Sequence, residues 1–547
     1  MGVWSFQTPL LKGNMKKKVL LPLLASSLAL VFGITACGGD NPSGPVNPEP
    51  KTARRIMTAS LAKKAIEPDQ KTKITCDTEG VTFRSSDTKI ATVNDKGEVV
   101  GVENGLAYIT LSKEGYFDRV LKVFVEDPQT IDYLVTGYEF GPAISGVKLN
   151  LPDKVKASDL ANAQFTVKTN NRDRTVTSVN LCDEEGEIID ATESKYIRID
   201  CDFRYSGYSV DASAACFTYS GMNKWMTNIT ASASLKAGSS LKVGDETLTS
   251  LTINQVSKRI VLSTKDWGEA KSHTAEGYTL MYKGYETDIL REDEVLNPLV
   301  IWLHGQGEGG QDPDIALLGN DVTALGEQKI QSHFVKGQQK GAYVLAVQSP
   351  TMWMDNGNGQ NHGGNAHSIY TKTLKSTIDK YIAENGDIDT NRIFVGGCSN
   401  GGYMTMEMAI TYGNFFRAFY PCCEAYQNAI VTEEDIAKLK DLQMWFVHAA
   451  NDRTVNPDNF TLGTYRRLMA AGAKDIHLSY FVNVQGKDGN PTGTNNYDGH
   501  WSWIYIFRDE VEFDQADYNN IAAPSTEPVK DASGTAMNLF DWMESKK

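Results

Sequence analysis

The stretch that decides the fold is Arg392-Ile393-Phe394-Val395-Gly396-Gly397-Cys398-Ser399-Asn400-Gly401-Gly402. Residues 393–396 form a short apolar run without polar alternation, which is typical of a strand buried on both faces. Residues 397–401 then fit the pattern G-x-S-x-G, and a helical pattern begins at residue 402. A strand that turns sharply into a helix exposes the serine hydroxyl. The pattern predicts that Ser399 is a nucleophile; an ordinary solvated serine in a glycine-rich turn is the alternative.

The same pattern continues on both sides of this stretch. Short apolar runs lie at residues 299–303, 342–347 and 444–447, and helical patterns lie at 370–384, 402–411, 433–440 and 463–471. Strands that alternate with helices at this spacing build a mostly parallel sheet with helices on both faces. We therefore predict a doubly wound α/β domain over residues 265–547, with its chemistry at the carboxyl ends of the strands.

A serine nucleophile needs a base, and the base needs a carboxylate to orient it. In strand–turn–helix sites of this kind the chain order is serine, acid, histidine. Of the histidines after Ser399, His477 lies in an alternating, strand-like segment, and His448 is too close to the predicted acid. His500 lies in a loop after the next strand and is the predicted base.

The predicted acid is Asp452, which follows the buried run at 444–447 almost directly. A structural role for Asp452, as the cap of a helix near residues 459–469, is the alternative. Asp498 is a rival because it neighbours His500. However, side chains two residues apart in a turning segment seldom form the required hydrogen bond, and Asp498 does not directly follow a buried strand.

An oxyanion needs backbone N–H donors that already point at the developing charge. Asn400, the residue after the nucleophile, is predicted to supply one of them. The second is expected from the glycine-rich loop at residues 304–310, which follows an apolar run. Gln306 is the first candidate in that loop and Gly307 the next. A phosphate-binding loop is excluded because no Lys-Ser/Thr pair follows the glycines.

These motifs together resemble the α/β-hydrolase superfamily. The matching segments are residues 303–310, 397–402, the Asp452 loop and Gly499-His500-Trp501. The chain is most similar to secreted bacterial esterases of the polyhydroxybutyrate-depolymerase-like and feruloyl-esterase-like kind, which are often labelled prolyl-oligopeptidase-like. The resemblance implies a serine carboxylic-ester hydrolase that uses no cofactor and acts on esters, including acyl groups of polysaccharides.

Two β-rich regions precede this domain. Residues 66–127 alternate short β-favouring runs with turn residues, which predicts a small sandwich. Phe83-Arg84-Ser85-Ser86-Asp87 and the glycines that follow resemble the bacterial group 2 Ig-like domain. Residues 131–264 resemble the Ig-like domain at the front of some bacterial esterases, on the opening motif Tyr138-Glu139-Phe140-Gly141-Pro142. The expected architecture is two all-β Ig-like sandwiches followed by an α/β-hydrolase domain.

The amino end is predicted to be a secretory signal over residues 1–36. A basic triplet at residues 16–18 precedes an apolar run, a combination typical of signal peptides. The run ends in Ile34-Thr35-Ala36-Cys37, which resembles a bacterial lipobox, so Cys37 is expected to carry lipid. A transmembrane anchor is the alternative. Residues 37–65 are the expected linker, and the rest of the chain is expected outside the cytoplasm, in the periplasm or on the cell surface.

Composition limits the function further. The net charge of −14 argues against a nucleic-acid binder, which needs a basic face. His362 and His367 lack the spacing of metal ligands, so no metal is expected. Trp353 and Trp501 flank loops at the predicted active face and are candidates for a substrate pocket. Cys398 bonds to Cys422 or Cys423 in one prediction, and all three are buried thiols in the other.

Two other functions remain open. A serine peptidase would use the same three residues, although the region before the hydrolase domain lacks the blade repeats of an oligopeptidase propeller. An adhesive or glycan-binding surface protein with an inactive hydrolase domain is the other alternative.

Overall fold

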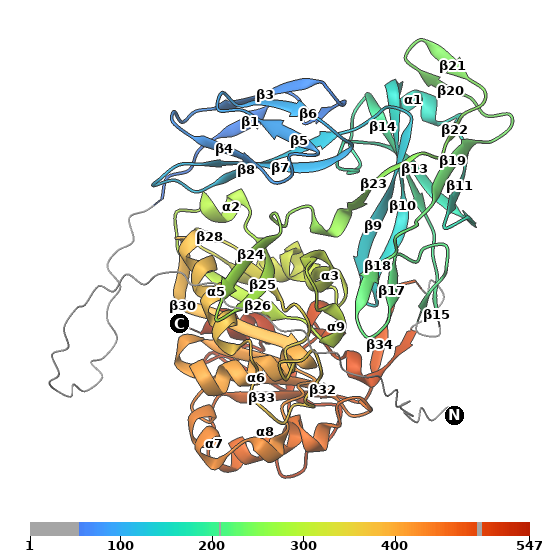
Figure 1. Cartoon of the computed structure of the whole chain (residues 1–547). Coiled ribbons are helices and arrows are strands. Elements are labelled where there is room, and N and C mark those ends of the chain that lie inside the picture. The colour runs from blue at the N-terminus through green and yellow to red at the C-terminus, as the bar shows by residue number, and fades with distance from the viewer. Residues whose placement is uncertain (1–53, 207–208, 490–494, 547) are drawn as a thin grey trace, which may run out of the picture. The chain divides into compact units, whose positions relative to one another are not determined.

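The computed structural model describes residues 54–206, 209–489 and 495–546. Strand β30 (Ile388–Cys398), which leads to Ser399, lies inside an eight-stranded sheet of order β24-β25-β29-β26-β30-β31-β32-β33 (Figure 1). The strands from β29 to β33 in that order are parallel, while β25 is antiparallel to β29 and to β24. The predicted doubly wound, mostly parallel sheet is confirmed. The other strands are β24 (Lys271–Ala275), β25 (Tyr278–Tyr285), β26 (Asn297–Leu303), β29 (Tyr343–Gln348), β31 (Ala418–Cys422), β32 (Met444–Ala449) and β33 (Ile476–Phe481).

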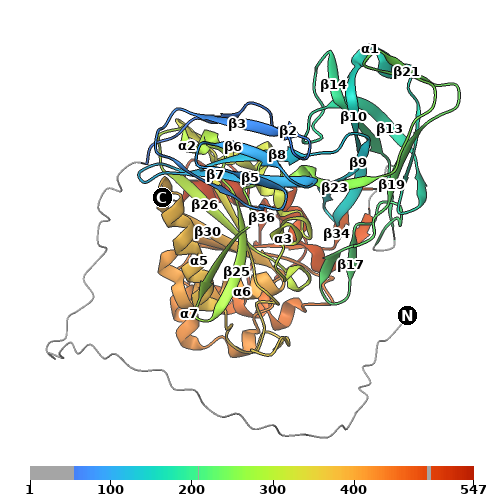
Figure 2. The same ribbon diagram turned by 45° about the horizontal axis from the view of Figure 1, so that its top comes forward.

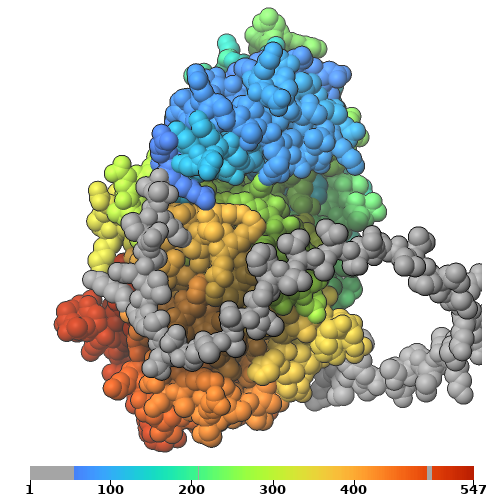
Figure 3. All heavy atoms as spheres, turned by 60° about the vertical axis from the view of Figure 1, so that its left-hand side comes forward, coloured from blue at the N-terminus to red at the C-terminus, as the bar shows by residue number. Residues whose placement is uncertain are grey.

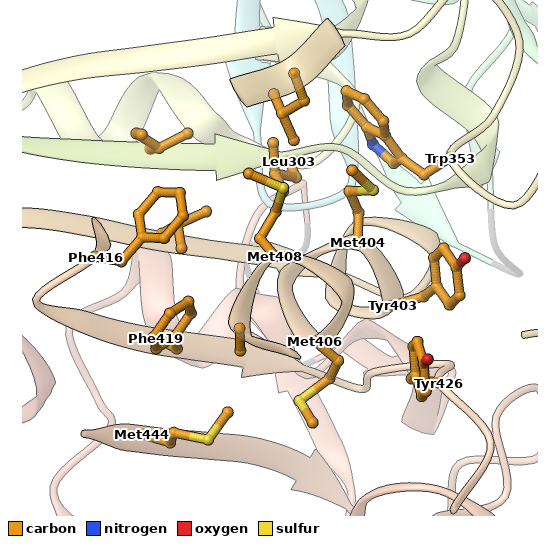
Figure 4. Packing of buried hydrophobic residues seen from close by; sticks show 14 of the residues in the cluster. Leu303, Trp353, Tyr403, Met404, Met406, Met408, Phe416, Phe419, Tyr426 and Met444 are labelled. Carbon is orange, nitrogen blue, oxygen red and sulfur yellow. The ribbon is translucent and has the colours of Figure 1, made fainter. Parts of the chain in front are cut away.

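Helices cover both faces of the sheet. Every residue of β26 is buried, and alternate residues of that strand enter two different hydrophobic clusters. Leu303 packs in the cluster with α6, Phe416 and Phe419 (Figure 4), whereas Trp302 packs in the cluster with α9 and α10. Burial on both faces explains why the strand sequences do not alternate. The helices of the first cluster are α5 (Thr371–Glu384), α6 (Asn400–Tyr412), α7 (Glu433–Leu439) and α8 (Thr461–Ala470); those of the second are α3 (Pro313–Leu318), α4 (Gln328–Gln331), α9 (Trp503–Phe507) and α10 (Leu539–Ser545).

The first β-rich region forms two four-stranded sheets, β1-β3-β6-β5 and β2-β8-β7-β4, around one hydrophobic cluster. Its atoms gather in one body, blue in Figure 3. Its strands are β1 (Ala59–Leu61), β2 (Ala65–Ile66), β3 (Lys71–Cys76), β4 (Thr82–Ser85), β5 (Ala91–Val93), β6 (Glu98–Gly101), β7 (Gly105–Ser112) and β8 (Arg119–Val125). This is the sandwich that the strand spacing predicts, but its predicted start at residue 66 is wrong, because β1 and the first residue of β2 lie in the segment predicted as linker and β1 packs in the same cluster.

The second β-rich region forms a five-stranded sheet, β13-β14-β10-β9-β23, and a four-stranded sheet, β12-β11-β19-β22 (Figure 2). Lys148 of β10 is fully buried, on the opposite face of the strand from the core residues Val147 and Leu149, with its Nζ 2.8 Å from Glu126 Oε1 and 3.2 Å from Asp132 Oδ2. The strands of the sheets are β9 (Thr130–Tyr138), β10 (Gly141–Lys156), β11 (Phe165–Thr169), β12 (Arg172–Arg174), β13 (Val176–Cys182), β14 (Glu193–Cys201), β19 (Ala231–Leu235), β22 (Thr252–Ile253) and β23 (Val256–Val261). A separate hairpin, β17 (Phe217–Tyr219) with β18 (Asn223–Trp225), projects from this region.

Neither the predicted signal nor Cys37 falls among the described residues. Across the described ranges, no helix is long and apolar enough to cross a membrane. Cys398, Cys422 and Cys423 are buried free thiols, so the predicted bridge beside the serine is absent. Of the two interpretations of these cysteines, the structure has the buried thiols.

The turn at Ser399 packs directly against β26. A Cβ added at Gly397 or at Gly401 would overlap the carbonyl oxygen of Leu303, the last residue of β26. Backbone atoms cannot move aside as a flexible side chain can, so both positions require glycine. The two glycines of the G-x-S-x-G pattern are therefore explained by close approach to the neighbouring strand.

We expect Gly401→Ala to destabilise the folded chain by about 3 kcal/mol or more, because the added methyl group meets backbone on a buried strand. Gly386→Ala is the matched control: a Cβ at Gly386 would meet only Arg54 Cδ, 3.9 Å away. The control should change stability by less than about 0.5 kcal/mol. Urea unfolding of the full chain measures both. Equal stability of the two variants would show that the close approach is not a constraint.

Candidate active site

Ser399 lies between the end of β30 and the start of α6, with a strained backbone. Its φ is 56° and its ψ is −111°, a conformation that a residue with a Cβ rarely adopts. Its N–H donates to the carbonyl of Cys422 at 3.0 Å, and its carbonyl accepts the N–H of Tyr403 at 2.8 Å. The side chain is partly exposed. The neighbouring strand and the helix thus hold the hydroxyl out at the carboxyl edge of the sheet.

Asp452 lies just after β32 and accepts four hydrogen bonds. Its Oδ1 accepts the backbone N–H groups of Thr454 at 2.8 Å and Val455 at 2.9 Å. Its Oδ2 accepts from His500 Nδ1 at 2.8 Å and from His448 Nε2 at 3.0 Å. Burial alone raises the pKa of Asp452, but the hydrogen bonds from the two histidines outweigh it and hold that pKa well below its usual range. Asp452 is therefore a carboxylate that serves two imidazoles.

His500 lies in the 3₁₀ turn η8 (Gly499–Trp501), where its ring meets Asp452. Its backbone N–H donates to Asp498 Oδ1 at 2.9 Å, so the rival acid binds the backbone of His500, while Asp452 binds the ring. Because Nδ1 donates to a carboxylate, the hydrogen-bond network assigns the free lone pair of the neutral ring to Nε2. Asp452 starts no helix, since the N-cap of α8 is Phe460.

The three predicted residues lie at the same edge of the sheet, the carboxyl ends of its parallel strands. Ser399 follows β30 and Asp452 follows β32, and β31 lies between these strands. Ser502, two residues after His500, has its Oγ 3.4 Å from Cys422 Sγ at the end of β31. No hydrogen bond joins Ser399 Oγ to His500 within the described ranges; the ring is joined to the site through Asp452.

The loop after β26 brings Gln306 and Gly307 to the same edge. They open the 3₁₀ turn η2 (Gln306–Glu308), and both are partly exposed. His304, just before them, accepts the N–H of Ser349 on Nε2 at 3.0 Å, and burial lowers its pKa to about 4. It is therefore a neutral ring that fixes the start of the loop.

Asn400, the first residue of α6, is fully buried. Its Oδ1 accepts the N–H groups of Trp353 at 2.6 Å and Met354 at 3.2 Å. The first N–H groups of an α-helix have no partner within the helix, so the backbone N–H of Asn400 is available next to Ser399. The side chain of Asn400 anchors the helix start, and its backbone N–H remains the predicted oxyanion donor.

Glu308 of this loop and its partner Asn223 of β18 were not predicted from the sequence as site residues. Glu308 is buried, its Oε1 accepts from Asn223 Nδ2 of β18 at 3.0 Å, and burial raises its pKa to about 7. A Cβ added at Gly307 would lie 3.4 Å from Asn223 Nδ2 and 3.6 Å from Tyr219 Cε2. Residues of the second Ig-like region therefore contact the predicted oxyanion loop.

The structure corrects one of the two predicted pocket residues. Trp353 is fully buried in the core, beside His304 and Tyr370, and so its ring offers no surface to a substrate. Trp501 is partly exposed and packs on Tyr497 at a ring distance of 5.2 Å. The sequence suggested an exposed Trp353 because the residue lies in a loop, but the buried side chain of Asn400 binds the backbone of that loop and holds it in the core.

His362 and His367 form no metal site. His367 Nδ1 pairs with Glu407 at 3.0 Å, while the His362 ring packs edge-on against Tyr403. No group of three or more metal-ligating side chains occurs in the part of the chain that the structure describes.

Two family models match the chain. Residues 130–258 match the esterase Ig-like N-terminal domain, and residues 286–484 match the phospholipase/carboxylesterase family. Residues 286–484 therefore belong to a carboxylesterase-type α/β-hydrolase domain. Its amino-terminal region carries the Ig-like domain that accompanies such esterases, as the resemblance implied.

Solved structures similar to this α/β-hydrolase include a thermostable esterase, with a TM-score of 0.54 and 20% identity, covering 70% of this chain and 96% of that one. A ferulic acid esterase has a TM-score of 0.33 and 11% identity, covering 44% of this chain and 95% of that one. An acetyl xylan esterase from Aspergillus awamori has a TM-score of 0.25 and 17% identity, covering 37% and 81%. Comparison with curated proteins gives no match. The thermostable esterase supports the fold.

We expect Asp452→Asn to lower kcat by about four orders of magnitude, because an amide can donate to His500 Nδ1 and leave the proton on the wrong ring nitrogen. Steady-state hydrolysis of a p-nitrophenyl ester measures the loss. Asp498→Asn is the matched control: asparagine keeps an oxygen for the His500 N–H, so kcat should stay within about tenfold of the parent value. A large loss in Asp498→Asn with a small loss in Asp452→Asn would make Asp498 the acid.

Proposed function

We propose that the chain hydrolyses carboxylic esters through a triad of Ser399, His500 and Asp452. The observation that carries this proposal is the 2.8 Å hydrogen bond from His500 Nδ1 to Asp452, at the sheet edge where the strained turn exposes Ser399. A histidine held in this way has a free Nε2 for a serine proton, and a carboxylate to stabilise the imidazolium that forms.

In the proposed reaction, Ser399 Oγ bonds to the ester carbonyl carbon as its proton moves to His500 Nε2. The backbone N–H groups of Asn400 and Gln306, with Gly307 as the alternative to Gln306, stabilise the oxyanion. His500 then gives the proton to the departing alcohol. Water attacks the acyl-enzyme with the same proton transfers, releases the acid and restores Ser399. The reaction uses no cofactor.

We propose acyl esters of polysaccharides as the substrate class. The support is the resemblance of the motifs around Ser399 and His500 to feruloyl-esterase-like enzymes, together with the predicted location outside the cytoplasm. Feruloyl and acetyl groups of plant polysaccharides are carboxylic esters, so the proposed reaction would release them. The fold alone does not fix a substrate.

We further propose that Cys37 carries the lipid that tethers the chain outside the cytoplasm, in the periplasm or on the cell surface. The support is the basic triplet, the apolar run and the small residues before Cys37. Two or more acyl chains give stable membrane attachment, which a single chain does not.

We expect Ser399→Ala to lower the turnover of a short p-nitrophenyl ester by about four to six orders of magnitude, because no other group replaces the nucleophile. A fluorophosphonate probe should label the parent protein and not the variant. The parent should also release acid from methyl ferulate or acetylated xylan faster than it cleaves peptidyl amides.

Three other results would contradict these proposals. If Ser399→Ala turns over the ester almost as fast as the parent protein, Ser399 is not the nucleophile. Faster cleavage of peptidyl amides than of every ester would identify a peptidase. A parent protein that neither reacts with the probe nor turns over any ester would support the adhesive surface protein with an inactive hydrolase domain.

We expect Cys37→Ala to abolish labelling by a radioactive fatty acid and to move the protein from the membrane fraction to the soluble fraction, because the thioether to the lipid cannot form. Cys76→Ala, which removes a cysteine from the first β-rich region, is the control and should leave labelling unchanged. A Cys37→Ala protein that stays in the membrane through alkaline carbonate washing would favour the transmembrane anchor.

A further inference from the structure

A chain of buried polar groups continues from Asp452 through His448, which binds the same carboxylate oxygen as His500. His448 Nε2 lies 3.0 Å from Asp452 Oδ2 and 3.1 Å from the carbonyl oxygen of Val455. His448 Nδ1 lies 2.9 Å from Thr461 Oγ1, and that hydroxyl lies 3.2 Å from Glu424 Oε1. The side chains of His448, Thr461 and Glu424 are fully buried. An unbroken row of hydrogen bonds therefore joins the triad carboxylate to a second, buried carboxyl group.

The partners of His448 determine where one of its protons lies. Both groups that face Nε2 are acceptors, a carboxylate and a carbonyl, so Nε2 carries a proton. Nδ1 has two possible states. If Glu424 is ionised, Thr461 donates to it and accepts from a protonated Nδ1, which makes His448 a cation. If Glu424 is protonated, it donates to Thr461, and Thr461 donates to a bare Nδ1, which leaves His448 neutral.

The surroundings of Glu424 favour the protonated carboxyl. Its Oε2 accepts the backbone N–H of Tyr426 at 2.7 Å, and no cationic side chain pairs with it in the described part of the chain. The titratable neighbours of Glu424 are Tyr426 in the same loop, on which Glu407 of α6 and Asp435 of α7 also act, and, beyond Thr461, His448 on β32. A buried carboxyl without a cation is more stable with its proton, and burial raises the pKa of Glu424 to about 8.

We propose that Glu424, through Thr461, holds His448 as a neutral ring with its proton on Nε2, so that His448 is a positioning residue for Asp452. The proton order is then Glu424 O–H to Thr461 Oγ, Thr461 O–H to His448 Nδ1, and His448 Nε2–H to Asp452 Oδ2 and the Val455 carbonyl. In this order, each hydrogen bond from Glu424 to Asp452 has one donor proton and one acceptor lone pair, so none is left unsatisfied.

The charge of His448 matters to the proposed reaction, on which this inference rests. A cation on Oδ2 would neutralise Asp452 and weaken its attraction for the imidazolium that forms on His500. A neutral N–H at the same place fixes the carboxylate and leaves its charge for His500. Neutral His448 therefore orients Asp452 without placing a second positive charge beside it.

The inference also sets a pH dependence of stability. The ordinary pKa of a glutamate is 4.5, and that of Glu424 in the folded chain is about 8. Between these values the folded chain keeps a proton that the unfolded chain has released, so folding loses stability as pH rises from 4.5 to 8. The contribution of Glu424 is complete below pH 4.5 and absent above pH 8.

The test uses the full chain with three substitutions. Thr461→Val removes the hydroxyl that links Glu424 to His448, Thr461→Ser restores it, and Glu424→Gln keeps a donor but cannot ionise. Thr464→Val is the matched control: Thr464 is equally buried on the same helix, and its hydroxyl lies 3.4 Å from Asn428 Oδ1, away from the triad.

We expect Thr461→Val to lower kcat by about tenfold with KM unchanged. Thr461→Ser should recover most of the loss, and Thr464→Val should change kcat by less than about twofold. Glu424→Gln should flatten the fall of melting temperature between pH 5 and 8. Nitrogen NMR of ¹⁵N-histidine-labelled protein, with His448 assigned by His448→Gln, should show a bare Nδ1 and a protonated Nε2 at pH 6.5.

Two results would overturn the proposal: a His448 ring with protons on both nitrogens at pH 6.5, or an unchanged pH slope of melting temperature in Glu424→Gln. Neither measurement needs turnover. If the protein hydrolyses no ester but gives the expected NMR and melting results, the proposed function is wrong. The inferred proton positions in Glu424, Thr461 and His448 would still hold. Full activity in Thr461→Val would show that the row is structural and does not position the acid.

Discussion

The contact between the backbone of the serine turn and the last carbonyl of β26 is the constraint on which the site depends. Parallel pairing of β26 with β30 brings the end of β26 against Gly397 and Gly401, and only residues without a Cβ allow that approach. The same pairing places the loop with Gln306 beside the start of α6. One strand end therefore sets both the strain at Ser399 and the position of the predicted oxyanion donors.

The main charged group of the site is the carboxylate of Asp452. Burial alone would favour its protonated, neutral form. Asp452 stays ionised because two backbone N–H groups and two imidazoles bind it. Glu308 and Glu424 lie in equally buried places with fewer donors, and their pKa values rise instead. The two imidazoles and two N–H groups around Asp452 offset the cost of burial, which raises the pKa of the other two carboxyl groups.

Much of the fold could be predicted because strands buried on both faces leave an unbroken apolar signal. The run at 299–303 lies within β26 and the pattern at 402–411 within α6. The boundaries differ because polar residues also join regular structure: β30 begins at Ile388, well before its apolar part. The order of serine, acid and histidine along the chain pointed to the same three residues that the structure brings to one sheet edge.

The rest of the site depends on contacts that sequence spacing does not encode. His448 and Asp452 are four residues apart, and only the turn after β32 shows that one ring binds the acid. Glu308 lies among glycines and suggested an exposed loop, but its partner, Asn223, is 85 residues away in another region. Trp353 is buried because Asn400 binds its backbone. Such pairings are properties of the folded chain.

The bond between Asn223 and Glu308 also bears on how such a chain can change during evolution. A catalytic unit inherited without the β17–β18 hairpin would leave Glu308 beside the predicted oxyanion loop without the amide N–H that binds its carboxyl group. Recombination that exchanges the front region therefore has to supply an equivalent amide, or to replace the acid at the same time. The second β-rich region and the α/β-hydrolase domain are therefore expected to be inherited together.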